Sequence, residues 1–127
     1  MRDLPLVARA TTHGGRLAIA APEGRFTYRD LLGASERAAS VLLAGRRDLA
    51  EARIAFLVPP GWHYVVVQWA VWRAGGVAVP LATSHPPAEL DYAVRDAGAE
   101  TVVGHRALLE KLRAVPAVAG RRLVTTE

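Results

Sequence analysis

The sequence has no cysteine and only one lysine among its 16 basic residues. Without cysteine the chain has no disulfide framework, no thiolate metal site and no cysteine nucleophile, which fits a reducing compartment. No apolar run approaches the ~18 residues that a membrane span needs, and residues 1–15 lack the apolar core of a secretory signal. We therefore expect a cytoplasmic protein with no membrane segment.

Nucleotide- and metal-binding signatures are also missing. No GxGxxG follows a predicted strand and no GxxxxGK[ST] occurs. The loop at residues 59–62, PPGW, is a poor phosphate cradle because prolines donate no hydrogen bond. No HExxH occurs and no two histidines have metal-ligand spacing, so we expect surface or core roles for all of them. The histidines are His13, His63, His85 and His105.

Catalytic patterns are equally scarce. Ser84 precedes His85, but catalytic partners meet in space and not by adjacency. Ser35 lacks the GxSxG elbow because Arg37 stands where the second glycine belongs. Gly75-Gly76 precedes a predicted strand, so it indicates a helix end and a turn. The carboxylates Glu89, Asp91 and Asp96 are typical of a solvated helix face. The sequence thus predicts no catalytic, cofactor-binding or metal-ligating residue.

The formal net charge of +4 and the pI of about 10.3 raise the question of nucleic acid. The basic residues are spread from Arg2 to Arg122, with only two adjacent pairs, at 46–47 and 121–122. No basic stripe alternates with exposed aromatic residues, as a single-strand binder requires. The distribution therefore argues against a nucleic-acid partner.

The residues that are present indicate a globular protein. Hydrophobic residues make up 51% of the 127 residues and charged residues 22%, which predicts a single domain over residues 1–127 with its own core. The sequence predicts a helix over Leu4–Ala10 capped by Asp3. Two extended segments, Leu17–Ala21 and Arg25–Tyr28, surround a Pro/Gly turn and predict a β-hairpin.

A long helix is predicted over Tyr28–Ala44. Thr27 and Asp30 have the spacing of a capping box at its start, and Gly45 ends it. Apolar residues recur at intervals of three and four, which predicts one buried face. These residues are Leu31, Ala34, Ala38, Val41 and Leu42.

The rest of the chain alternates strands and helices, which predicts an α/β fold with parallel strand–helix–strand units after the N-terminal helix and hairpin. The β-branched segment at residues 64–67 would also suit a strand, but its length and the following Gly-Gly favour a helix. The predicted strands are Ile54–Val58, Val77–Leu81, Thr101–Val103 and Leu123–Thr126, and the predicted helices are Trp62–Ala74, Pro87–Ala97 and His105–Arg113.

The helix Trp62–Ala74 is apolar almost all round, with Trp62, Trp69 and Trp72. Such a helix is buried on more than one side, in a core or an interface; an acyl pocket is the alternative. We expect part of its surface, and the strand edge near Leu123, to need a partner. The partner is either the remainder of a longer chain or a second copy, with self-association through the Trp62–Ala74 helix.

Three segments carry a family resemblance. Residues 26–31 read FTYRDL, residues 73–81 read RAGGVAVPL and residues 86–98 read PPAELDYAVRDAG. In this order they resemble the N-terminal portion of AMP-forming acyl-CoA synthetases, in the adenylate-forming ligase superfamily. The resemblance extends from about Leu4 to Val124. It is closest to malonyl-CoA synthetase-like and fatty-acyl-CoA ligase members, and implies part of their first N-terminal subdomain.

The resemblance implies a parent enzyme of fatty acid metabolism that joins a carboxylic acid to coenzyme A through an acyl-adenylate, using ATP and magnesium. The family's phosphate loop, its Tyr-Gly-x-Thr-Glu segment, its ribose-binding aspartate and its C-terminal lysine have no counterpart here, and Lys111 lies in no such motif. We therefore expect an N-terminal scaffold segment that is inactive alone and binds no cofactor itself. The alternatives are a non-catalytic interaction module on the same scaffold and part of a peptide-synthetase adenylation domain, whose acceptor is a carrier-protein thiol.

Overall fold

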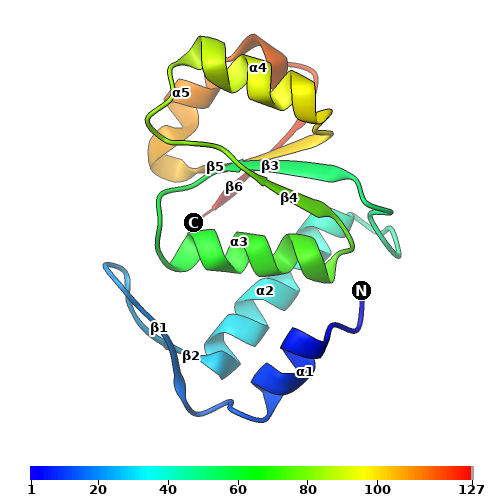
Figure 1. The fold of residues 1–127 in the computed structure, drawn as a ribbon, viewed down its shortest axis with the longest axis vertical. Helices are drawn as coiled ribbons and strands as arrows, with labels where there is room; N and C mark the ends of the chain where they lie inside the picture. The colour runs from blue at the N-terminus through cyan, green and yellow to red at the C-terminus, as the bar shows by residue number, and fades with distance from the viewer. Residues whose placement is uncertain (127) are drawn as a thin grey trace. The chain divides into compact units, whose positions relative to one another are not determined.

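The computed structural model describes residues 1–126, so Glu127 of the predicted single domain lies outside the described residues. The chain forms two compact units. Unit 1 comprises Met1–Ala50 and Pro60–Gly76, and unit 2 comprises Glu51–Pro59 and Val77–Glu127. The prediction of one domain stays a prediction. The predicted α/β class, with a helix and a hairpin ahead of a parallel sheet, is confirmed (Figure 1).

Unit 1 contains three helices and an antiparallel hairpin. Helix α2 packs on both α1 and α3. A cluster of apolar side chains, with Ala10, Leu31, Val66 and Trp69 buried, holds these elements together. The elements are α1 (Pro5–Thr11), β1 (Leu17–Ala21), β2 (Gly24–Thr27), α2 (Tyr28–Leu43) and α3 (Trp62–Arg73).

Two local predictions in unit 1 are wrong. Helix α1 begins after Leu4, not Asp3, and has no side-chain cap, because the leucine at the cap position has no oxygen to accept a hydrogen bond. On α2, Val41 is 50% exposed whereas Ser35 is fully buried. The buried face is therefore centred one position away from the predicted apolar stripe. A polar partner for the Ser35 hydroxyl, described below, makes that shift possible.

Helix α3 settles the ambiguity between strand and helix in favour of the helix. Trp69 is 8% exposed and Trp62 is half-buried, and the expectation that this helix needs a partner or a second copy stays a prediction. Trp72, at 37%, is the exposed tryptophan. The buried residues of α3 are Val66, Val67, Trp69, Ala70 and Val71.

Unit 2 is a parallel four-stranded sheet in the order β4-β3-β5-β6, which places β6 at an edge as predicted. The helices α4 and α5 lie on the same face of this sheet (Figure 1). The elements are β3 (Arg53–Leu57), β4 (Val77–Pro80), α4 (Pro87–Ala97), β5 (Thr101–His105), α5 (Leu109–Arg113) and β6 (Arg122–Thr126), with 3-10 turns η1 (Arg106–Leu108) and η2 (Pro116–Val118).

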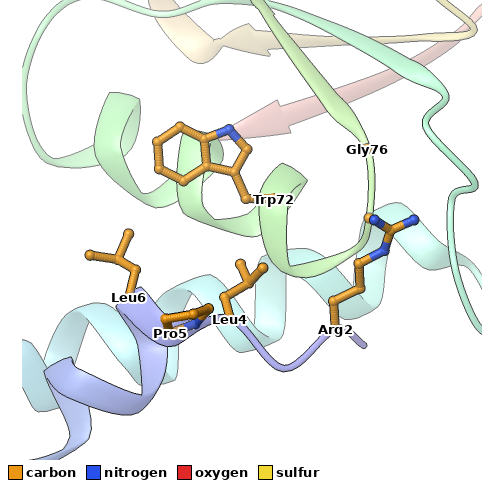
Figure 2. Close-up of a pocket in the computed structure, with 7 residues that line it drawn as sticks. Arg2, Leu4, Pro5, Leu6, Trp72 and Gly76 are labelled. Carbon is orange, nitrogen blue, oxygen red and sulfur yellow. The ribbon is translucent and has the colours of Figure 1, made fainter.

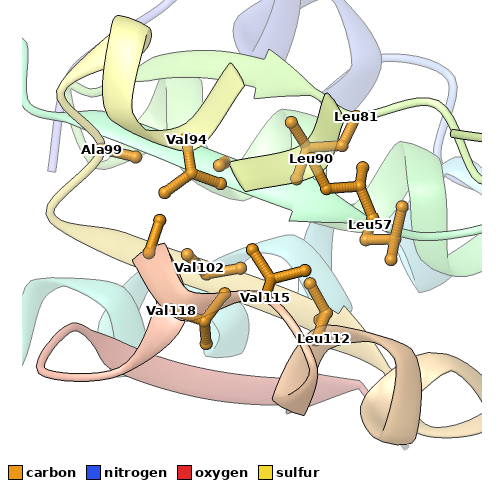
Figure 3. Packing of buried hydrophobic residues seen from close by; sticks show 11 residues of the cluster. Leu57, Leu81, Leu90, Val94, Ala99, Val102, Leu112, Val115 and Val118 are labelled. Carbon is orange, nitrogen blue, oxygen red and sulfur yellow. The ribbon is translucent and has the colours of Figure 1, made fainter. Parts of the chain in front are cut away.

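The core of unit 2 is almost purely aliphatic (Figure 3). Leu57 of β3 and Val102 of β5 belong to one cluster with Leu90 and Val94 of α4, because alternate side chains along each strand point to the same face of the sheet. Gly104 of β5 is required for close packing, since a Cβ there would overlap the side chain of Leu112. The other buried members of the cluster are Ala55, Leu81, Ala99, Val115, Ala117 and Val118.

The predicted helix His105–Arg113 is interrupted. Strand β5 continues to His105, whose Nδ1 accepts a hydrogen bond from the Ala107 N–H at 3.1 Å. This side-chain cap starts the 3-10 turn η1, and α5 begins only at Leu109. The turn η2, which Pro116 starts, was not predicted.

Candidate functional site

The N-terminus of α2 is fully satisfied by the chain itself. Thr27 and Asp30 form the predicted capping box, with N–O distances of 2.8 and 3.2 Å. The Tyr28 N–H donates to the Arg16 carbonyl and the Arg29 N–H to the Gly14 carbonyl, both at 3.0 Å. With these donors used, the helix end offers no cradle for a phosphate.

The N-terminus of α3 is occupied by a carboxylate from the hairpin. Gly61 precedes α3 with φ 153°, and a Cβ there would lie 2.8 Å from Glu23 Oε1. The pKa of Glu23 is lowered, first by its own backbone N–H and then by those of Trp62 and His63 and by the charge of His63, which together outweigh burial. The rings of Phe26 and Trp62 are stacked, with their centroids 3.9 Å apart and their planes at 9°. This stack holds the hairpin against the start of α3. This helix end already holds an anion.

Arg73, the first residue of the RAGGVAVPL segment, connects α3 to α2. Its Nη1 donates to the Leu32 carbonyl and to Ser35 Oγ, each at 2.8 Å. Its Nε is buried without a hydrogen-bond partner. The Ser35 hydroxyl therefore belongs to a bond between helices and not to a nucleophilic site.

Gly75 of the same segment makes room for an ion pair. Arg2 Nε and Nη2 contact Asp48 Oδ2 and Oδ1 at 2.8 and 3.1 Å. A Cβ on Gly75, whose φ is 85°, would lie 2.7 Å from Arg2 Nε and would overlap the Asp48 carboxylate. The Arg2 side chain, and then the Ala50 N–H, lower the pKa of Asp48 to about 2.

A shallow groove of about 310 Å³ lies beside this ion pair in unit 1 (Figure 2). Its wall is mostly apolar, and the Trp72 indole and the Leu6 side chain are partly exposed on it. Its one charged lining residue, Arg2, already pairs with Asp48. The residues that line the groove therefore do not fit a nucleoside triphosphate, whose phosphates need cationic partners. The groove is lined by Arg2, Leu4, Pro5, Leu6, Trp72, Gly75 and Gly76.

The polar side chains of unit 2 mainly hold its segments in place. Asp91 accepts hydrogen bonds from Arg95 at 2.9 Å and from the Ala117 N–H at 2.6 Å. Arg95 is the largest cause of its lowered pKa. Asp91 is therefore a link between α4 and η2 and not just part of a solvated face. Lys111 Nζ donates to the Thr83 carbonyl at 2.7 Å.

Three of the histidines contact different partners. The ring centroids of His13 and Tyr28 are 6.3 Å apart, and His85 Nε2 lies 3.4 Å from Glu89 Oε2. His105 caps the 3-10 turn η1. Over residues 1–126, no three or more histidine, aspartate or glutamate side chains are grouped so that they could hold a metal ion. Within that same range, no helix is both long and apolar enough to cross a membrane.

Solved structures with the same fold include CoA ligases and a nonribosomal peptide synthetase. A benzoate CoA ligase from Burkholderia xenovorans superposes with a TM-score of 0.83 at 26% identity, over 96% of this chain and 25% of that one. The apo structure of MatB from Rhodopseudomonas palustris gives 0.78 at 31% identity, over 94% of this chain and 25% of that one.

The sequence comparisons point to the same class. Residues 6–126 match the model of the AMP-binding enzyme family, and the chain therefore belongs to that family. The mitochondrial malonate–CoA ligase of Homo sapiens is 41% identical over 118 residues, which are 90% of this chain and 20% of the relative. The chain thus spans about a fifth of the length of the malonate–CoA ligases it matches.

Proposed function

We propose that this chain is the N-terminal scaffold of an ATP-dependent acyl-CoA ligase that acts on malonate or a similar carboxylic acid. The observation that carries the proposal is the 41% identity to the human malonate–CoA ligase. The reaction would form an acyl-adenylate and transfer the acyl group to coenzyme A. Its place in fatty acid metabolism is the finer part of this proposal.

We further propose that the segment alone binds neither ATP, magnesium nor coenzyme A and is inactive. The N-termini of α2 and α3 are already satisfied, that of α2 by backbone carbonyls with a capping box and that of α3 by Glu23. Phosphoryl chemistry needs positioned donors and cations at the phosphates. In this proposal those groups belong to residues outside this segment.

A chimera tests the scaffold role. The 118 matched residues of the human ligase are replaced by the corresponding residues of this chain, and malonyl-CoA formation is measured with ATP, malonate and coenzyme A. We expect activity within about tenfold of the parent, because a scaffold needs only to fold and pack. The same chimera with Leu90→Asp, which puts a charge in the unit 2 core, is the matched control and should be inactive.

The 127-residue polypeptide is assayed alongside for pyrophosphate release. Turnover with ATP and malonate that survives repurification would contradict the proposal that the segment is inactive alone. A folded but inactive chimera would contradict the scaffold proposal.

The alternatives predict different outcomes. In a peptide-synthetase adenylation domain the acyl group would pass to a carrier-protein thiol, so a carrier-protein domain encoded next to this segment in the same gene would support that alternative. A non-catalytic module would leave every chimera inactive. A cytoplasmic location is also part of the proposal; the human relative is mitochondrial, and fractionation of the source cells distinguishes the two compartments.

A further inference from the structure

The hairpin of unit 1 is less well covered than the helices on which it lies. No residue of β1 or β2 is fully buried, whereas α2 and α3 have five buried residues each. The pairing of the two strands is also irregular, because its register shifts between Leu17 and Ile19. An isolated two-stranded hairpin is marginally stable in water. The position of this hairpin therefore depends on the contacts that hold it to the rest of unit 1.

The two ends of the hairpin are held by backbone groups at the start of α2. The Tyr28 N–H donates to the Arg16 carbonyl and the Arg29 N–H to the Gly14 carbonyl, both at 3.0 Å. Thr27, the last residue of β2, is also the N-cap of α2. These bonds lie outside the paired part of the strands. They can therefore persist when the strands move away from the helices.

The paired part of the hairpin is fastened to α3 at two places. Glu23, in the turn between the strands, has its carboxylate oxygens 2.8 and 2.9 Å from where a Cβ of Gly61 would stand. This carboxylate accepts hydrogen bonds from the backbone N–H groups of Trp62 and His63. The Phe26 ring stacks on the Trp62 indole. Glu23 is exposed and the two rings are half-buried, so neither fastening belongs to the buried core.

We propose that the hairpin β1–β2 is a strap that opens as one piece while α2 and α3 stay folded, and that Glu23 and Phe26 fasten it to α3. Segments with few buried apolar contacts open at a lower free energy than the core of the same domain. The helices keep their own contacts when the strap opens, since α2 packs directly on α3. The strap is a property of this chain and does not depend on the proposed ligase function.

Opening of the strap changes what the start of α3 presents to solvent. Ala18 and Ile19 of β1 pack against the apolar cluster of unit 1, and the Phe26 ring covers one side of the Trp62 indole. When the strap opens, these apolar surfaces are uncovered together with the first N–H groups of α3, which have no partner inside the helix. The closed hairpin thus shields Trp62 and the start of α3.

Hydrogen exchange of the full 127-residue chain, measured at increasing urea below the unfolding midpoint, tests the strap. The free energy of global unfolding falls steeply with urea because much surface is exposed, whereas a partial opening has a smaller slope. We expect the cross-strand amides of β1 and β2 to share one such smaller slope. Without urea they should exchange at least about tenfold faster than the central amides of α2 and α3. Exchange at the global rate, or a different urea-independent rate for each amide, would overturn the proposal.

A variant of α2 separates the strap from the helices. Leu42 is buried but lies outside the cluster that the hairpin covers. Leu42→Val should raise the exchange of the central α2 and α3 amides by about threefold or more, because a small cavity lowers global stability. The hairpin amides should stay within about twofold, because Leu42 is packed in the same way whether the strap is open or closed. An equal rise in both sets would mean that the hairpin opens only when the helices unfold, and would refute the strap.

Variants of the hairpin test the two fastenings. Glu23→Gln combined with Phe26→Leu removes the carboxylate charge and the ring stack, and should raise the exchange of the hairpin amides by about tenfold. Circular dichroism checks that the helices remain. The matched control is Arg25→Gln, because Arg25 lies between these residues on β2 and is exposed; it should change the exchange by less than about twofold. A double variant that behaves like this control would show that Glu23 and Phe26 do not fasten the strap.

Discussion

The two units hold their helices in different ways. In unit 2, Leu90 and Val94 of α4 and Leu112 of α5 are completely buried in one aliphatic cluster. One cluster of unit 1 has four buried residues and a larger rim of partly buried ones, and further apolar residues of α2 and α3, such as Leu42 and Val71, are buried outside it. Both units have polar contacts between segments distant in sequence, and in unit 1 one of these contacts, Arg73 with Leu32, joins two helices.

Burial of apolar side chains and hydrogen bonds between polar groups contribute differently to the stability of a fold and to the arrangement of its helices. A buried leucine contributes about 2–5 kcal/mol, whereas one hydrogen bond contributes about 0.5–1.5 kcal/mol net. We therefore expect unit 2 to depend on volume. The arrangement of helices in unit 1 should depend on where a few polar groups meet.

The largest effect is expected for Leu90→Ala in unit 2. Leu90 is 0% exposed, so truncation leaves a cavity, and we expect a loss of about 3 kcal/mol in the free energy of unfolding, measured by urea denaturation. Tyr92→Ala on the same helix is the control, since Tyr92 is 70% exposed, and should cost less than about 0.5 kcal/mol. Similar losses for both variants would mean that the aliphatic cluster does not dominate unit 2.

Arg73→Ala tests the polar contacts of unit 1. The change leaves the buried Ser35 hydroxyl without its donor from α3, and we expect a loss of about 2 kcal/mol. A double-mutant cycle with Ser35→Ala should give a coupling energy of at least about 0.5 kcal/mol. Additive effects would show that Arg73 acts through its apolar stem and not through this bond.

Much of the fold could be predicted because local patterns agreed with one another. The capping box at Thr27 and Asp30, the apolar strand from Ile54 and the helix Pro87–Ala97 with Gly98 after it all appear as expected. Gly98 takes a left-handed conformation with φ 64°, which explains why that helix ends there. Such signals lie within one or two turns of the residues they control.

The features that were missed depend on residues far apart in sequence. Ser35 could be buried because Arg73 reaches it, 38 residues later. Glu23 stands at the start of α3 because the Phe26–Trp62 stack brings the hairpin there. Neither contact could be predicted from the sequence, because no characteristic spacing relates the two partners. A glycine before a helix start, here Gly61, is the one local sign that a side chain from elsewhere approaches.

Glu23→Gln tests the contact at the start of α3. Replacing the carboxylate weakens its interaction with the helix N-terminus, and we expect a loss of about 0.5 kcal/mol near neutral pH. The pKa of Glu23 is lowered on folding, so its contribution is present above the unfolded pKa and is lost as pH falls through the folded one. The difference between wild type and variant should accordingly shrink in acid. Glu36→Gln, on the exposed face of α2, is the control.

The ion pair of Arg2 and Asp48 should give the smallest effect, because it is exposed to solvent. Asp48 has a pKa of about 2 when folded, below its ordinary value of 3.8. Its stabilising contribution is therefore complete above pH 3.8 and is lost between that pH and about 2. Asp48→Asn should flatten the fall of stability with decreasing pH in that window, followed by urea midpoints. In the Asp48→Asn background, Arg2→Gln should change this pH dependence no further. A further change would mean that Arg2 acts on other carboxylates, and that the contacts of unit 1 extend beyond the pair beside Gly75.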